Sequence, residues 1–230
     1  MKQLCLSFVL IGILSGQSNI GFRYDTFADI ELSDQAENII NSTVMWVGQS
    51  SPVWMENNQR FSIKLLADKS VMKNNLYGWS LPNFSMFIKA SRNLTLSLKM
   101  TGFSLKEDLP QVIGGGLRLN LGSDENPLWQ FSADRSQING LRDFRLNTTT
   151  LTFFRKYHIR NFTTSLGIGV NTFKGRALNF LEEIEKNIEG EKNFFNIHVS
   201  IPAFGFHLGT GLSIYSQMNI LRFSLERGFH

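Results

Sequence analysis

The stretch Asn93-Leu-Thr-Leu-Ser-Leu-Lys-Met-Thr-Gly-Phe103 decides the fold class of this chain. Leucine or methionine stands at every second position from residue 94 to residue 100, with threonine, serine or lysine between them. Successive side chains of a β-strand point to opposite faces, so this period of two predicts a strand with one apolar and one polar face. Residues 83–91 alternate in the same way, and Ser91-Arg92-Asn93 suits a tight turn. The two runs together predict a β-hairpin.

The same alternation recurs along most of the chain. Several runs reach about ten residues or more, the length that a tilted membrane strand needs, whereas soluble strands usually have five or six. The less apolar face is rich in Gly, Ser, Thr and Asn, and aromatic residues gather near the ends of the runs, as in an interfacial girdle. The expected strands are 21–29, 39–48, 60–70, 83–91, 93–103, 112–122, 128–136, 143–154, 160–173, 193–200, 203–215 and 217–229.

These features predict an all-β protein, a closed antiparallel up-and-down transmembrane β-barrel. Both ends of such a barrel face the periplasm, so the number of strands is even. The runs give twelve strands, and ten is the alternative count. The segments 92, 123–127, 155–159 and 201–202 are expected as short periplasmic turns, and the longer connections as outer loops.

The first 19 residues have the pattern of a secretory signal peptide. Lys2 supplies a positive charge, Leu4 to Leu14 is apolar, and small or turn residues follow. The apolar run is too short to span a bilayer as a helix, and the alternative is a buried N-terminal strand or helix. Residues 20–230 then form a single barrel domain. Cys5 is the only cysteine, so the mature chain has no disulfide and no thiol chemistry.

Composition and motifs argue against several function classes. The formal net charge is +4 with scattered basic residues, which gives no indication of nucleic-acid binding. The sequence lacks G-x-S-x-G, H-E-x-x-H, P-loop and C-x-x-C motifs. We therefore predict no catalytic residue, no metal and no cofactor.

One outer loop carries a helical pattern. Leu178, Leu181, Ile184 and Ile188 recur at helix spacing, and Gly190 can end the helix. The predicted helix, 178–189, is either a cap over the barrel mouth or a partner-binding helix, or it is a short solvated helix packed on the rim.

Basic residues outnumber acidic ones on the predicted lumen face. They favour either a pore selective for anions or an ion-pair network that plugs a narrow barrel. The acidic residues of that face are Asp68, Asp134 and Glu226. The basic residues are Arg60, Lys64, Lys89, Lys99, Arg118, Arg145 and Arg222.

Two histidines are expected to face each other across the last hairpin but one. If Pro202-Ala203 is a two-residue turn, His198 lies opposite His207, and both point into the lumen beside Ser200. Opposed strand residues have Cβ atoms about 5 Å apart. Such a pair can share a metal, respond to pH or, with Ser200 and Asn196, mimic a hydrolase set, or it can simply fill the lumen with polar side chains.

The chain end resembles the C-terminal assembly signal of Gram-negative outer-membrane proteins, an amphipathic strand that closes on an aromatic residue. Leu221, Phe223, Leu225 and Phe229 follow its spacing. It departs in two ways: His230 follows the phenylalanine, and Arg227 takes an apolar position. The resemblance is to the class and implies a place in the bacterial outer membrane, contact with outer-membrane lipid and insertion by the barrel-assembly machinery.

Three hypotheses for function follow. The first is a non-enzymatic outer-membrane barrel, either a small passive channel or a structural or assembly component of the envelope. The second is an outer-membrane hydrolase that acts on lipid or peptide, with His198, Ser200 and His207 as its site. The third is a soluble periplasmic β-barrel or sandwich that binds an apolar ligand and turns its apolar face inward.

Overall fold

The computed structural model describes residue 22 and residues 32–71, 80–102, 108–122, 127–178 and 187–230. Within these ranges the chain forms a helix and ten strands, and no helix there is long and apolar enough to cross a bilayer. The elements are α2 (Leu32–Val47), β1 (Phe61–Val71), β2 (Ser80–Lys89), β3 (Leu94–Gly102), β4 (Gln111–Gly122), β5 (Pro127–Asn139), β6 (Phe144–Ile159), β7 (Phe162–Ala177), β8 (Asn187–Ala203), β9 (Phe206–Tyr215) and β10 (Asn219–Phe229).

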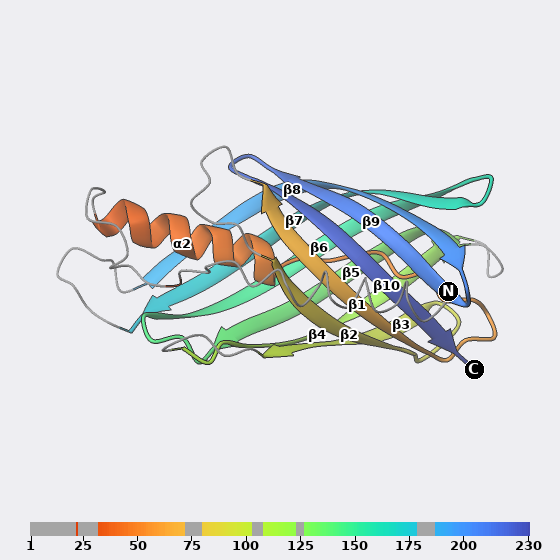
Figure 1. Ribbon diagram of the computed structural model, residues 1–230, viewed down its shortest axis with the longest axis horizontal. Helices are drawn as coiled ribbons and strands as arrows, with labels where there is room; N and C mark the ends of the chain where they lie inside the picture. The colour runs from red at the N-terminus through yellow and green to blue at the C-terminus, as the bar shows by residue number, and fades with distance from the viewer. Residues whose placement is uncertain (1–21, 23–31, 72–79, 103–107, 123–126, 179–186) are drawn as a thin grey trace.

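The ten strands form a closed antiparallel barrel (Figure 1). Each strand pairs with its neighbours in the chain, and β1 also pairs with β10. Opposite charges face each other across this closing seam, since Lys64 pairs with Glu226 and Asp68 with Arg222. Cross-strand pairs of opposite charge favour one register over its neighbours. The register of β1 against β10 is therefore specified by these two ion pairs as well as by backbone hydrogen bonds.

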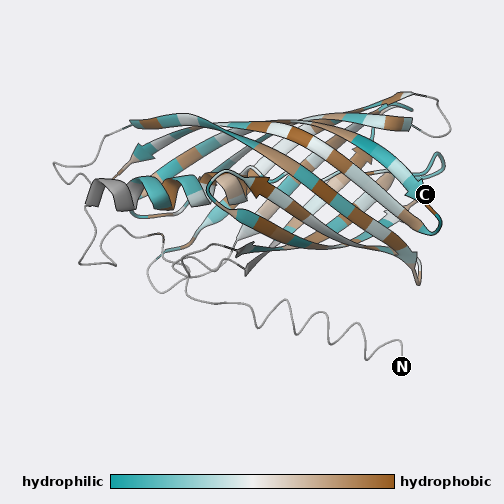
Figure 2. Ribbon diagram, turned by 90° about the horizontal axis from the view of Figure 1, so that it is seen from above, coloured by the Kyte–Doolittle hydropathy of each residue, from teal (hydrophilic) through white to brown (hydrophobic). Residues whose placement is uncertain are grey.

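The polar face of the sheet lies inside the barrel and the apolar face lies outside. Ser62, Thr150 and Asn171 are fully buried, whereas Leu96 and Ile168 on the outer surface are 46% and 64% exposed. Figure 2 shows this alternation along the strands. A soluble barrel would bury its large apolar side chains, so this distribution contradicts the third hypothesis and confirms a barrel of the membrane type.

The strand count agrees with the alternative of ten. The expected strand 39–48 is wrong, because residues 32–47 form α2. Ile40, Val44 and Val47 lie at the spacing i, i+4, i+7 and are buried on one face of that helix. The expected strand 21–29 lies outside the described residues except for Phe22, which is buried against Phe144 with ring centroids 6.4 Å apart.

The helix expected at 178–189 falls mostly outside the described residues, but its end is wrong. Residues 187–203 form β8, which pairs with β7 as far as Arg176 opposite Asn187. The ladder with β7 thus continues past Gly190, where the sequence predicts the end of a helix.

Two turns lie two or more residues later than expected. β6 continues to Ile159 and β8 to Ala203, so the turns are Arg160-Asn161 and Phe204-Gly205. Both Phe204 and Gly205 have positive φ, 55° and 78°. A type I′ hairpin turn requires this conformation at both central residues, and glycine adopts it without strain. The later turn changes the register of β8 against β9.

Candidate functional site: a strap through the barrel lumen

The chain crosses the barrel interior before its first strand begins. Helix α2 lies at one end of the barrel and the C-terminus at the other, which we call the helix end and the C-terminal end (Figure 1). Residues 48–59, which we call the strap, connect α2 to β1. Because β1 starts where Phe61 pairs with Phe229 at the C-terminal end, the strap must run the length of the lumen.

The barrel wall holds the strap mainly by its backbone. Residues 48–53 are buried and form no helix or strand, so their polar main-chain groups need partners from side chains. Seven strands donate hydrogen bonds to carbonyl oxygens of residues 47–56. The pairs are Lys99 with Val47 (2.9 Å), Thr150 with Gly48 (2.8 Å), Asn196 (3.3 Å) and Arg222 (2.8 Å) with Ser50, Lys64 with Pro52 (3.0 Å), Gln130 with Val53 (2.6 Å) and Lys89 with Glu56 (3.1 Å).

A buried charge cluster fixes the middle of the strap. The Arg222 guanidinium lies 2.6 Å from an Asp68 carboxylate oxygen, and both side chains are almost fully buried. The same guanidinium donates to the Ser50 carbonyl and to the Gln49 side-chain oxygen. Asn83 donates to the other Asp68 oxygen at 3.1 Å. Each charge thus has an opposite charge and further hydrogen bonds, the condition for a buried ion pair to be tolerated.

A second cluster holds the strap from the other side of the lumen. The Ser50 hydroxyl donates to Asp134 at 2.9 Å and lies 3.1 Å from the hydroxyl of Ser132. Asp134 also pairs with Arg118 at 3.2 Å and accepts from Ser97 at 3.2 Å. Ser50 is therefore tied to both charge clusters, because its carbonyl accepts from Arg222 and its hydroxyl donates to Asp134.

The helix end is closed by apolar packing. Ile39, Ile40, Val44 and Val47 of α2 belong to one buried cluster with side chains of the barrel wall. The wall residues of this cluster are Val112, Ile138, Leu141, Phe144, Leu146, Phe173 and Ala177. Met45 joins a second buried cluster with Phe194, Tyr215, Met218 and Ile220. The apolar faces of α2 thus pack against an apolar rim of the barrel, and we call this helix the stopper.

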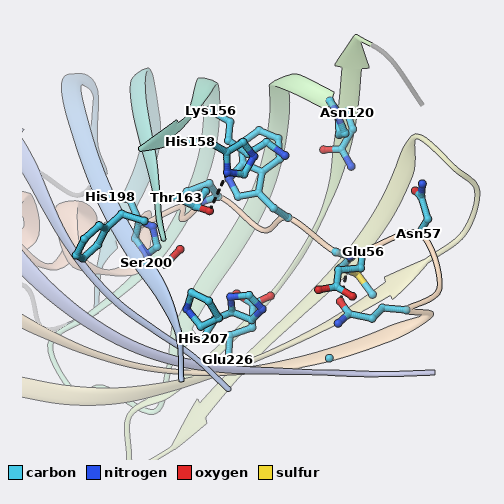
Figure 3. Close-up of a pocket in the computed structure, with 18 of the residues that line it drawn as sticks. Glu56, Asn57, Asn120, Lys156, His158, Thr163, His198, Ser200, His207 and Glu226 are labelled. Atoms are coloured by element: carbon cyan, nitrogen blue, oxygen red, sulfur yellow. Dashed lines mark hydrogen bonds between the residues drawn. The ribbon is translucent and has the colours of Figure 1, made fainter. Parts of the chain in front are cut away.

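The C-terminal end is more open. A cavity of about 480 Å³ lies between the last part of the strap and the wall, and we call it the vestibule (Figure 3). Its lining combines polar and apolar groups and includes Trp54, Lys89, Lys156, His198, His207 and Glu226. Among the described residues, no group of three or more His, Cys, Asp or Glu side chains is placed to hold a metal ion.

Five of the seven predicted lumen cations lie inside the barrel, and each contacts the strap, the end of α2 or a carboxylate. They are Lys64, Lys89, Lys99, Arg118 and Arg222. Arg60 lies one residue before β1 and is exposed at the C-terminal end. The expectation for Arg145 is wrong. It is exposed on the outer face, because its neighbours Phe144 and Leu146 point inward to pack on α2.

The predicted facing of His198 and His207 is also wrong. With the turn at Phe204-Gly205, His198 lies opposite Gly211 and His207 opposite Pro202. Both histidines line the vestibule, but they are not cross-strand neighbours. The His198 ring nitrogen contacts the Ser224 hydroxyl at 3.4 Å, and the Asn196 amide donates to Ser50 and Ser213. The side chains therefore do not assemble into the hydrolase set that the sequence suggested.

Sequence reasoning missed the strap itself. Two signals pointed to it: the helical spacing of Ile40, Val44 and Val47, and the length of the segment 49–59, which is long for a periplasmic turn. A segment that lies inside a barrel has no periodicity of its own, because its partners come from many strands.

No family model and no curated protein matches the chain. Among solved structures it is similar to Omp33, an outer-membrane protein of Acinetobacter baumannii, with 7% identity, a TM-score of 0.38 and coverage of 76% of this chain and 100% of that one. It is also similar to a KdgM porin in complex with disordered oligogalacturonate, with 12% identity, a TM-score of 0.38 and coverage of 74% of this chain and 99% of that one. For the translocator domain of the autotransporter NalP from Neisseria meningitidis, the identity is 9%, the TM-score is 0.35, and the match covers 86% of this chain and 95% of that one. These neighbours are outer-membrane β-barrel proteins that share 7–12% identity with the chain, and they indicate no specific family.

Proposed function

We propose that this protein is a closed outer-membrane barrel, a structural component of the envelope that carries its own N-terminal helix to the cell surface. One observation supports this proposal above all: the strap lies in the lumen, and the carbonyl oxygens of residues 47–56, at the end of α2 and in the strap, accept hydrogen bonds from seven strands. A lumen occupied in this way leaves no continuous path for solutes.

The outer surface supports the membrane location. Large apolar side chains such as Ile88, Met100 and Phe223 are more than half exposed around the barrel. Burying one such side chain in hydrocarbon contributes about 1.5–3 kcal/mol relative to leaving it in water. Trp129 stacks on Phe153 with ring centroids 5.0 Å apart on the same surface, as expected for an aromatic girdle at a membrane interface.

The lengths of the connections give the orientation. At the C-terminal end the strands are joined by segments of two to four residues, whereas at the helix end segments of up to nine residues occur. Outer-membrane barrels have short periplasmic turns and longer outer loops. The C-terminal end is then periplasmic, and α2 lies at the outer mouth.

Cysteine labelling in intact cells tests this arrangement. Cys5 is the only cysteine and lies in the predicted signal peptide, so one engineered cysteine at a time gives an unambiguous signal. Asn38 on α2 and Phe204 in the last periplasmic turn are both exposed. We expect a membrane-impermeant maleimide to label Asn38→Cys in intact cells and Phe204→Cys only after the outer membrane is permeabilised. The opposite result, or equal labelling of both, would contradict the proposal.

A specific observation also favours a second candidate, a gated channel. The strap contacts the wall through polar groups, and four cations lie at or beside it. Lys64 and Arg222 donate to its carbonyl oxygens, and Lys99 and Arg118 line a small cavity together with Gln49 and Ser51 of the strap. If the strap leaves the lumen, it uncovers a pore with an excess of positive charge, which favours anions. Stepwise conductance of the intact protein that disappears when the strap is covalently fixed would support the channel over the closed barrel.

A further inference from the structure

The vestibule at the C-terminal end has an unbalanced charge. Four cationic side chains line it, from Lys89, Arg92, Lys156 and Arg160, and two carboxylates, from Glu56 and Glu226. Glu226 is already bound to Lys64 at 3.3 Å and to the Ser62 hydroxyl at 3.0 Å. The cavity therefore presents more positive than negative charge to whatever enters it.

Lys156 is the cation whose surroundings point to a ligand. Its side chain is only 7% exposed, and its Nζ lies 4.6 Å from the centre of the Trp54 ring. Among the described residues it has no carboxylate partner and donates no hydrogen bond. Its ammonium group lines the vestibule and has no hydrogen-bonding partner within the described protein, so it is free to bind an anion that enters the cavity.

The tryptophan beside Lys156 is itself fixed. The Trp54 indole nitrogen donates to the Ser165 hydroxyl at 3.0 Å, so the strap presents one ring face to the ammonium group. The aromatic face stabilises the cation and does not occupy its N–H donors, which can face the vestibule. The ammonium is thus held at the cavity wall with donors available.

The strands add neutral donors next to this cation. In one cross-strand row Lys156 lies opposite Ser165, and Ser165 opposite His198. In the next row of inward side chains His158 lies opposite Thr163, and Thr163 opposite Ser200. Lys156, His158, Thr163, His198 and Ser200 gather on one side of the vestibule, across from Glu56 and Asn57 (Figure 3). Hydroxyl and imidazole groups around an ammonium form a site that suits a phosphate group.

We propose that the vestibule binds a phosphate-bearing solute from the C-terminal side, with Lys156 as the principal charged contact and Thr163 and Ser200 as hydroxyl donors. The ligand is a free solute rather than a lipid, because the lining side chains point into the lumen and the barrel wall separates them from hydrocarbon. The site belongs to the state in which the strap occupies the lumen, because Trp54 of the strap forms part of the vestibule wall.

Calorimetric titration of the intact protein in a non-ionic detergent with inorganic pyrophosphate tests this site. We expect saturable binding at constant ionic strength that is weakened at least 10-fold by Lys156→Met and largely retained by Lys156→Arg. Lys174→Met is the matched control, because Lys174 is an exposed lysine paired with Glu189 on strands of the same barrel. A heat-modifiability gel shows that each variant is folded.

Two results would overturn the proposal. The first is the absence of saturable binding by the folded wild-type protein at millimolar pyrophosphate. The second is equal weakening by Lys156→Met and Lys174→Met, which would mean that the anion responds only to overall charge. The double variant Thr163→Val/Ser200→Ala gives an independent test that keeps every charge, and we expect a smaller but measurable loss of about 3-fold.

Discussion

Replacing Arg222 by methionine tests whether the central charge cluster holds the strap. Methionine keeps much of the length of the side chain but removes the guanidinium group. The substitution takes away the ion pair with Asp68, at 2.6 Å, and the donors to the Ser50 carbonyl and the Gln49 side chain. Asp68, itself 1% exposed, keeps only the hydrogen bond from Asn83.

The magnitude follows from which groups lose all their partners. The Ser50 carbonyl still accepts from Asn196, and the Gln49 oxygen still accepts from Ser213, so neither is left unsatisfied. The large cost is the buried carboxylate without its counter-charge, and breaking one partner of a buried ion pair costs about 3–5 kcal/mol. We therefore expect Arg222→Met to lower the free energy of unfolding by about that amount.

Urea unfolding of the barrel in detergent micelles, followed by gel mobility and intrinsic fluorescence, measures this loss. Lys174→Met is the control, because it breaks an exposed pair whose contribution is about 0–1 kcal/mol. Adding Asp68→Asn to Arg222→Met removes the stranded charge, so the double variant should be more stable than Arg222→Met alone. If Arg222→Met is no more destabilising than Lys174→Met, the cluster does not hold the strap and the reasoning is wrong.

Two further predictions concern the passage of the chain from α2 into the strap. A Cβ added at Gly48 would lie 1.8 Å from the Asn171 amide nitrogen, so we expect Gly48→Ala to lower the free energy of unfolding by about 1–3 kcal/mol. The control is Gly102→Ala, where no atom lies nearer than 3.9 Å to the added Cβ. In the same urea assay it should change the free energy of unfolding by no more than about 0.5 kcal/mol. Ile40→Ala removes a fully buried side chain from the stopper and should cost about 2–5 kcal/mol, measured as faster hydrogen exchange in α2. The control is Asn38→Ala at an exposed site of the same helix. Equal hydrogen exchange in the two variants would argue against a packed stopper.

The sequence predicted the wall of the barrel better than its contents. Alternation located ten strands because the inner and outer faces meet different surroundings along almost the whole barrel. The pattern failed where the inside is apolar, at Phe144 and Leu146, since these side chains pack on a helix that the alternation did not predict. For that reason the alternation predicts a lumen position for Arg145, which is exposed on the outer face.

The site was predicted only in part. The charges of the lumen face were found, because Lys64, Lys99, Arg118 and Arg222 alternate with apolar residues on their strands. Their partners were not found, since the carbonyl oxygens of residues 47–56 carry no sequence signal. The register of His198 and His207 depended on one turn, and a type I′ turn at Phe204-Gly205 is hard to foresee with phenylalanine at positive φ.

A disulfide can fix the strap in place for a direct test. The Ser50 and Ser132 hydroxyl oxygens are 3.1 Å apart, so cysteines at both positions should form a disulfide that ties the strap to β5. The complementary variant deletes residues 32–59 and keeps the leader. A heat-modifiability gel establishes that each barrel is folded before it is used.

The most direct measurement is conductance across planar bilayers for the wild-type protein, the Ser50→Cys/Ser132→Cys variant under oxidising conditions, and the deletion of residues 32–59. We predict that the wild-type and oxidised barrels stay closed and that the folded deletion variant opens a pore that prefers anions. A steady current through the oxidised barrel, or no current through the folded deletion variant, would contradict the claim that the strap closes the lumen.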